Sequence, residues 1–215
     1  VNMNGISYLS KERLLDELKK ISKLNTLEKL SKDKFSLEIF SIIFPELKNI
    51  SCFSKLSLKK KEILNENNDI FLLSLMIIDK TDNADYFLYK FNISKKDQKR
   101  IKFIDNFYKE KVNSKTFTKN RMNKIFYFHG KEAVIDILNF RIINSKKIED
   151  ALIKLSEMYK NRKIPVLPIG ADVLMTKYKI PEGKELGIKL KIIEEEWVNN
   201  NFKITDQQLE NIIKI

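Results

Sequence analysis

Hydrophobic residues recur at intervals of three or four along almost the whole chain. After Ser10, a suitable N-cap, the positions Leu14, Leu18 and Ile21 predict a first helix over about 10–23. Further helices are expected near 25–30, 37–44, 53–64, 69–79, 83–91, 94–111, 117–128, 131–143, 146–161 and 183–200. No useful stretch alternates apolar and polar residues as a half-buried strand does. The pattern therefore predicts an all-α fold, an irregular array of about ten helices without a β-sheet.

Helix-breaking residues concentrate in one short stretch of the last fifty residues. Three of the four prolines and three of the five glycines lie within 165–187. Because a proline disfavours helical backbone angles in the residue before it, we expect 164–169 to be extended. The breakers surround short helical pieces and predict a fixed backbone path there. Within the helix that follows, Gly187 is expected to permit close helix packing.

Bulk composition fits a folded protein of one large domain or two small ones. The chain has 215 residues, of which 43% are hydrophobic and 33% charged. The longest apolar run, residues 70–78, is too short to cross a bilayer and predicts a buried helix. No signal peptide is visible, and the single cysteine, Cys52, excludes an internal disulfide and a cysteine zinc cluster. We therefore expect a cytoplasmic protein.

The charge is positive and uneven. The net charge is +12 at pH 7, and twelve Lys or Arg residues face three acidic residues within 91–131. A surplus of this size favours a polyanionic partner such as RNA, DNA or an acidic membrane surface. A solvated lysine-rich face is the alternative interpretation. The helix that carries much of this charge is expected to begin at a Ser94 cap.

Residues for catalysis are hard to find. The sequence has no phosphate-binding glycine loop, and no two aspartates are separated by a single residue, as two-metal nucleotidyl transfer usually requires. His129 is the only histidine and fits a helix end beside Gly130 better than a metal site. We therefore predict no catalytic residue and no metal ligand in this chain.

Two segments together resemble a known family. The first, Gly5-Ile-Ser-Tyr-Leu-Ser10-Lys-Glu12-Arg13-Leu-Leu-Asp-Glu17-Leu18, is similar to the Ser-x-Glu-Arg-Ile-x-x-Glu-Leu helix of class II tRNA nucleotidyltransferases. These are the CCA-adding enzymes and their bacterial poly(A) polymerase relatives. Phe44-Pro-Glu-Leu47 resembles the Phe-Pro-Glu-Leu that follows in the family.

The second segment resembles the tail of the alphaproteobacterial branch of that family. It runs Gly170-Ala-Asp-Val-Leu, then Pro181-Glu-Gly-Lys-Glu-Leu-Gly187, then Glu-Glu-Trp197, then Asn201-Phe. The family pattern is Gly-x-Asp-Leu, Pro-Gly-x-x-Leu-Gly and Glu-x-x-Trp. The chain departs from it where Glu182 splits the Pro-Gly pair and where Ala171 and Val173 replace more usual residues.

The resemblance implies a division into neck end (1–50), helical body (51–160) and tail (161–215). In the family a head domain holds the Asp-x-Asp metal site, and the body and tail hold the tRNA. The implied partners are thus the acceptor–T arm of tRNA and a catalytic head in the same or a separate chain. The implied cofactors, Mg²⁺ and CTP or ATP, belong to that head, so this chain is not expected to be active alone. By resemblance, Glu12, Arg13 and Glu17 support the nucleotide pocket, and Arg13 and Glu17 are spaced to pair.

The residues expected to contact RNA phosphates are basic side chains and glycine turns. They are Lys95, Lys96, Lys99, Arg100, Lys102, Lys119, Arg121, Lys124, Gly170, Lys177, Lys179, Gly183 and Lys184. The aromatic residues Tyr108, Phe126, Tyr127 and Phe128 are base-stacking candidates, although such spacing is more typical of a core.

Two other functions fit the sequence. One is a basic helical scaffold that binds an acidic protein or membrane without catalysis. The other is a complete enzyme with a site built from 194–196, Asp136 or Asp150.

Overall fold

The computed structural model describes residues 9–110, 112 and 114–214, and these residues are helical without a β-strand. The all-α prediction is therefore confirmed. The part of the first resembling segment from Gly5 to Tyr8 lies outside the described residues, as does the expected end of a helix at Lys111.

The described residues form twelve α-helices and two short 3₁₀-helices. They are α1 (Lys11–Ile21), α2 (Leu24–Leu30), α3 (Lys34–Ile43), η2 (Ile50–Phe53), α4 (Leu58–Asn65), α5 (Asp69–Ile77), α6 (Asn83–Lys90), α7 (Lys95–Lys109), η3 (Ser114–Phe117), α8 (Lys119–Asn144), α9 (Asp150–Lys160), α10 (Ala171–Tyr178), α11 (Lys184–Asn199) and α12 (Asp206–Lys214).

Local side-chain chemistry explains where helices begin. The Ser10 hydroxyl accepts a hydrogen bond from the Arg13 backbone N–H at the start of α1. At the start of α7, Ser94 accepts from the Asp97 N–H in the same way. Both caps satisfy an N–H that has no partner inside the helix, as the sequence predicted.

Gly130 breaks α8 where the sequence predicts two helices. Helix α8 spans Lys119–Asn144, but Gly130 within it has φ 87° and ψ 174°, which are not helical angles. A residue with a Cβ rarely adopts such a positive φ. The predicted pair of helices, 117–128 and 131–143, is thus confirmed on either side of a glycine break.

The described chain forms two compact units, and each takes residues from two stretches of sequence. Unit 1 comprises Val1–Val112 and Asp136–Leu155, and unit 2 comprises Asn113–Ile135 and Ser156–Ile215. This grouping places the expected neck end with most of the expected body. It also places the expected tail with the first part of α8.

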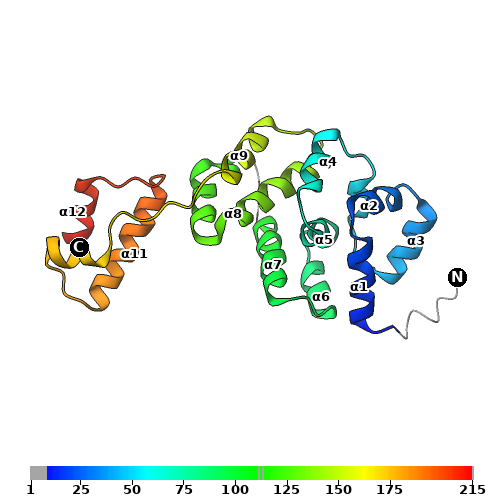
Figure 1. The fold of residues 1–215 in the computed structure, drawn as a ribbon, viewed down its shortest axis with the longest axis horizontal. Coiled ribbons are helices and arrows are strands. Elements are labelled where there is room, and N and C mark those ends of the chain that lie inside the picture. Colours follow the sequence, from blue (N-terminus) through cyan, green and yellow to red (C-terminus); the bar gives the residue numbers. More distant parts are fainter. Residues whose placement is uncertain (1–8, 111, 113, 215) are drawn as a thin grey trace. The chain divides into compact units, whose positions relative to one another are not determined.

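Helix α5 forms the centre of unit 1. Every residue from Ile70 to Ile78 is buried, including Ser74, whose hydroxyl donates to the Ile70 carbonyl. Helices α6 and α7 pack against α5 and lie side by side in Figure 1. The predicted buried helix over 70–78 is confirmed. Across the described ranges, no helix is both long enough and apolar enough to span a bilayer.

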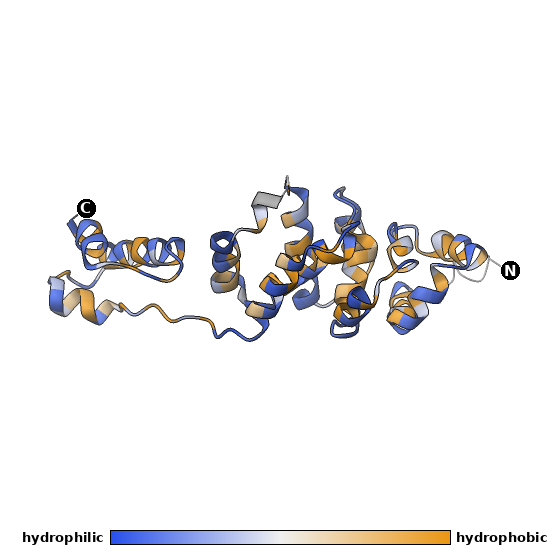
Figure 2. Ribbon diagram, turned by 90° about the horizontal axis from the view of Figure 1, so that it is seen from above, coloured by the Kyte–Doolittle hydropathy of each residue, from blue (hydrophilic) through white to orange (hydrophobic). Residues whose placement is uncertain are grey.

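Unit 2 has an apolar core between its last three helices. The core residues are Leu174, Ile180, Leu186, Ile193, Leu209 and Ile212. The proline-containing segment between α9 and α10 lies outside the helices, as expected for 164–169, and Figure 2 shows it as a helix-free stretch that is partly hydrophobic.

Two glycines near the start of α11 differ in what they do for the backbone. Gly183 precedes the helix with φ 149°, a backbone conformation that L side chains rarely adopt. The prediction that Gly187 permits close helix packing is wrong. In the described part of the chain, an added Cβ at Gly187 would meet no atom within 4 Å.

Helix α12 is absent from the sequence-based prediction, although the sequence carries its signal. Thr205 and Gln208 form a capping box: the Thr205 hydroxyl accepts from the Gln208 N–H, and the Gln208 side chain accepts from the Thr205 N–H. This Thr-x-x-Gln pattern is a recognised start of a helix. Leu209 and Ile212 then face the unit 2 core.

Candidate nucleic-acid interface

Helix α7 presents a row of lysines on the side opposite its core-facing residues. Ile101 and Ile104 are fully buried. Lys95, Lys99 and Lys102, spaced by four and three residues, form a row on the exposed side. Lys96 is also exposed, one residue away from that row. The sequence predicts phosphate binding by these four lysines, and the structure gathers them on the exposed surface of one helix.

The charge on this row is uneven from one end to the other. Near its C-terminal end, Lys109 is bonded to Asp105 at 2.7 Å and to Asp85 at 3.0 Å, and Lys102 lies 3.8 Å from Asp85. Among the described residues, Lys95, Lys96 and Lys99 have no ion-pair partner. The uncompensated cations therefore cluster in the first turns of α7.

Arg100 does not belong to the exposed row. Its guanidinium donates to both Asp136 oxygens, at 2.6 and 2.7 Å, and its Nη1 donates to Asn68 Oδ1 at 3.0 Å. The Arg100 side chain is 20% exposed and Asp136 only 2%. Its expected role as a phosphate contact is replaced by a structural one, because the partner carboxylate comes from a distant helix.

The basic residues expected in the C-terminal part of the chain lie in unit 2. Lys119 and Lys124 are exposed on α8, and Arg121 on the same helix is half-buried. Lys177 and Lys179 are exposed at the end of α10, where Lys179 caps the helix with φ 57°. The predicted contact residues therefore divide between the two units.

Both glycine turns expected to contact phosphate are helix starts. Gly170 is the N-cap of α10, and the Asp172 carboxylate lies where a side chain on residue 170 would go. That carboxylate disfavours a phosphate at this terminus. Lys184 follows the Gly183 cap as the exposed first residue of α11, but Glu182 and Glu185 flank this turn with two negative charges. The two turns therefore have a clear backbone role and only a weak attraction for an anion.

The α1 residues assigned to nucleotide-pocket support are all on the surface. Glu12, Arg13 and Glu17 are exposed. The expected Arg13–Glu17 pair is wrong: Glu17 accepts from Lys20 at 2.8 Å. This hydrogen bond, more than the charge of Arg13, lowers the pKa of Glu17.

The aromatic candidates separate into buried and exposed residues. Phe126 is fully buried, and Tyr108 is 5% exposed with its hydroxyl on the Ile137 carbonyl. Tyr127 packs against Trp197 with ring centroids 5.4 Å apart. Of the four, Phe128 exposes about half of its surface, 52%. The core interpretation holds for Phe126 and Tyr108.

Sequence reasoning missed two exposed aromatic residues on α6. Tyr86 is 58% and Tyr89 87% exposed. The signal was available, because Ala84, Phe87 and Leu88 define the apolar face of the helix and leave both tyrosines outside it.

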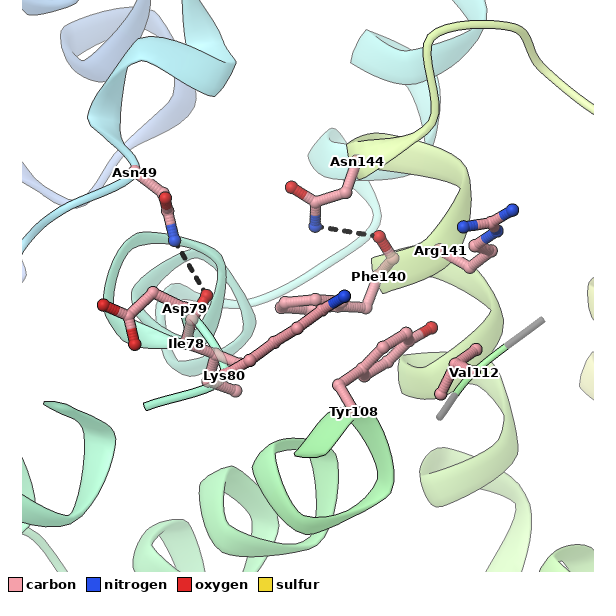
Figure 3. Close-up of a pocket in the computed structure, with 9 residues that line it drawn as sticks. All are labelled: Asn49, Ile78, Asp79, Lys80, Tyr108, Val112, Phe140, Arg141 and Asn144. Atoms are coloured by element: carbon pink, nitrogen blue, oxygen red, sulfur yellow. Dashed lines mark hydrogen bonds between the residues drawn. The ribbon is translucent and has the colours of Figure 1, made fainter. Parts of the chain in front are cut away.

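Unit 1 also contains a pocket of about 290 Å³ with a mixed polar and apolar lining. Its lining residues are Asn49, Ile78, Asp79, Lys80, Tyr108, Val112, Phe140, Arg141 and Asn144. The centroids of the Tyr108 and Phe140 rings, both part of the lining, lie 4.6 Å apart. In Figure 3 the Lys80 side chain extends across the pocket.

The amide groups of this pocket are oriented by the main chain. Asn49 donates to the Ile78 carbonyl at 2.7 Å, and Asn144 donates to the Phe140 carbonyl at 3.0 Å (Figure 3). Lys80 is held at φ 70°, which is uncommon for a lysine. The pocket lining thus combines two cationic side chains, Lys80 and Arg141, with the Asp79 carboxylate and two oriented amides.

Three of the carboxylates considered for a complete enzyme, Glu194, Glu196 and Asp136, are engaged in structure, whereas Asp150 is exposed at the start of α9. Glu194 accepts from the Tyr127 hydroxyl at 2.6 Å, and Glu196 accepts from Asn200 at 2.9 Å. Asp136 is held by Arg100. Over the described ranges, no group of three or more His, Cys, Asp or Glu residues is placed to hold a metal ion.

Residues of the segments that carry the family resemblance connect loops to helices through side-chain contacts. Glu46 of the Phe-Pro-Glu-Leu segment is 2% exposed and paired with Lys90 at 2.7 Å. Asn201 accepts from the Asn123 side chain at 2.8 Å, and it adopts φ 57°. These residues tie loops to helices within each unit.

A scan against protein-family models and a search of curated proteins each found no match for this chain. Its function is therefore inferred from its own residues.

Proposed function

We propose that this chain is an RNA-binding helical module. More specifically, we propose that it is the tRNA-holding portion of a CCA-adding or poly(A)-adding nucleotidyltransferase. In this role it binds the acceptor–T arm and presents the 3′ end to a catalytic head in the same or a separate chain. Mg²⁺ and the nucleotide belong to that head, and the cytoplasm is the expected compartment.

The observation that carries the proposal is the position of Lys95, Lys96 and Lys99. They occupy the first turns of α7, which is the positive end of the helix dipole. Helix stability favours acidic residues in the first turn, where Asp97 lies, and the two cations of that turn, Lys95 and Lys96, each cost about 0.3–1 kcal/mol. Lys99 follows in the second turn, beyond most of this effect. Three exposed lysines without ion-pair partners among the described residues therefore support the proposal of an anion-binding surface.

Structured RNA fits this surface better than a DNA duplex whose base sequence the protein reads. RNA helices offer proteins mainly shape, phosphates and 2′-hydroxyls. Lysine is a point charge that binds phosphates without reading bases. The family resemblance of the segments 5–18, 44–47 and 170–202 supports tRNA within this class.

Binding of unmodified tRNA across a salt series tests the proposal. Changing Lys95, Lys96 and Lys99 to Gln should weaken binding. It should also lower the slope of log K against log salt by about 0.7–0.9 for each phosphate that the variant no longer neutralises. The matched control changes Lys19, Lys29 and Lys32, three exposed lysines of α1, α2 and the following turn, to Gln. Equally weakened binding by the two triple variants would contradict a specific α7 site.

Two further measurements separate the alternatives. Equal affinity for heparin and for tRNA would favour the basic scaffold that binds an acidic partner. Incubation with tRNA, Mg²⁺ and labelled CTP or ATP should give no incorporation by this chain alone. Incorporation would overturn the assignment of catalysis to a separate head.

A further inference from the structure

The exposed face of α6 carries two tyrosines that the packing of unit 1 leaves uncovered. Tyr86 and Tyr89 are 58% and 87% exposed, whereas Phe87 between them is fully buried. A single exposed apolar residue is ordinary on a protein surface. Two large rings three residues apart on one helix face form an exposed patch of the kind that marks binding sites.

This patch borders the lysine row of α7. Asp85 of α6 bonds Lys109 at 3.0 Å and lies 3.8 Å from Lys102, so this side of α6 meets the lysine side of α7. Tyr89 is one helical turn after Asp85 on the same side of α6. Residues so spaced have Cβ atoms about 5–6 Å apart.

The direction of the two helices brings Tyr89 toward the uncompensated lysines. Only residues 91–94 connect α6 to α7, and the helices run back along each other (Figure 1). The end of α6 therefore lies beside the beginning of α7. Tyr89 is near that end, and Lys95 and Lys99 are near that beginning.

Aromatic rings beside a row of cations are the two elements of a surface for unpaired nucleotides. Lysines bind the phosphates, and exposed rings stack on bases that are not already stacked in a duplex. Any base presents a face for stacking, so such a surface needs no base-reading motif. The carboxylate of Asp85 is compensated by two lysines and does not remove the positive field.

We propose that Tyr86 and Tyr89 stack on unpaired nucleotides of the RNA whose phosphates bind the first turns of α7. The ligand class is thus an RNA with a single-stranded segment next to a structured part. This inference rests on the proposed RNA-binding function and refines it. A membrane surface fits less well, because a helix that lies on a membrane buries its apolar face in the lipid, and the apolar face of α6 is already buried in unit 1.

Two RNA probes and two pairs of variants test the proposal. The probes are a blunt RNA hairpin and the same hairpin with a six-nucleotide single-stranded 3′ tail, both measured by fluorescence anisotropy at one low salt concentration. Tyr86→Ala and Tyr89→Ala should each weaken binding of the tailed hairpin by about tenfold and leave the blunt hairpin unchanged. Tyr86→Phe and Tyr89→Phe should retain wild-type binding, because the ring is kept. Thermal unfolding by circular dichroism verifies that all four variants fold.

Each outcome bears on a different part of the inference. If the wild type binds both probes equally and the alanine variants bind like the wild type, the tyrosine proposal fails and the proposed RNA-binding function stands. If neither RNA binds, the proposed function itself fails. A third outcome would overturn the proposal in favour of a membrane surface as the partner of the two tyrosines. In it, the wild type binds phosphatidylglycerol vesicles, the alanine variants lose that binding, and all variants bind the tailed RNA equally.

Discussion

Arg100 holds Asp136 through two parallel hydrogen bonds, Nε to Oδ2 at 2.6 Å and Nη2 to Oδ1 at 2.7 Å. Asp136 is almost fully buried, so the pair fixes the second half of α8 against α7 within unit 1. A buried carboxylate that loses its partner remains as an uncompensated charge. We expect Arg100→Ala to lower the free energy of unfolding by about 3–5 kcal/mol.

Urea denaturation followed by circular dichroism measures this effect. The control is Lys99→Ala, an exposed neighbour on the same helix, which should change stability by less than about 0.5 kcal/mol. The double change Arg100→Met and Asp136→Leu should recover much of the stability, because it removes both charges. Equal stabilities for Arg100→Ala and Lys99→Ala would show that the Arg100–Asp136 pair does not stabilise the fold.

Asp105 should make stability depend on pH. Burial of its carboxylate raises its pKa above the ordinary 3.8, although the hydrogen bond from Lys109 opposes the shift. The folded protein therefore holds this proton more tightly than the unfolded chain does. The resulting stability is fully present below 3.8 and is lost as pH rises through the raised pKa.

The variant Asp105→Asn isolates this contribution, because an amide does not titrate. As pH falls from 7 toward 4, the wild type should gain stability relative to the variant, measured by urea denaturation at each pH. The pKa of Lys109 is raised above its ordinary 10.5, so its own titration lies outside this range. A difference that stays constant, or that changes in the opposite direction, would contradict the raised pKa.

Cys52 should resist thiol reagents while the protein is folded. Burial raises its pKa to about 12, and the nearby positive charge of Lys60 offsets only part of that effect. At pH 8 the folded protein then has roughly a thousandfold fewer thiolates than an ordinary cysteine, and the thiolate is the reactive form. Reaction with a chromogenic disulfide should be slow in buffer and fast in urea, with Cys52→Ser as the blank. Rapid labelling in buffer would contradict the raised pKa.

Asn123 should hold unit 2 together. It is fully buried: its Nδ2 donates to Asn201, and its Oδ1 accepts from Tyr159 at 2.8 Å and from Arg162 at 2.7 Å. Asn123→Ala removes these hydrogen bonds from a buried position and should cost about 1–3 kcal/mol.

The fluorescence of Trp197 provides a local measurement, since it is the only tryptophan and is 3% exposed in unit 2. In Asn123→Ala, the urea transition followed by fluorescence should move to lower concentration. Asn120→Ala, at an exposed position of the same helix, serves as the control and should leave it in place. A shift of equal size in both variants would argue against the buried network.

Features with a local cause were predictable from the sequence. The Ser10 and Ser94 caps, the buried run of α5 and the break at Gly130 each depend on a few neighbouring residues. The α12 capping box was equally local and was overlooked. Features that depend on distant packing were not predictable. Arg100 meets a carboxylate 36 residues away, and the exposure of Tyr89 depends on which neighbours cover α6.

The interleaved composition of the two units has a practical consequence for dissecting the protein. A fragment that stops at residue 155 keeps all of unit 1 but still carries Asn113–Ile135 without the rest of unit 2. Phe126, now fully buried against Tyr159 and Arg162, would then lose both neighbours, and the fragment should aggregate. No single truncation isolates either unit. The contribution of each unit to RNA binding is therefore measured with point substitutions, or with a rearranged gene that joins residue 112 directly to residue 136.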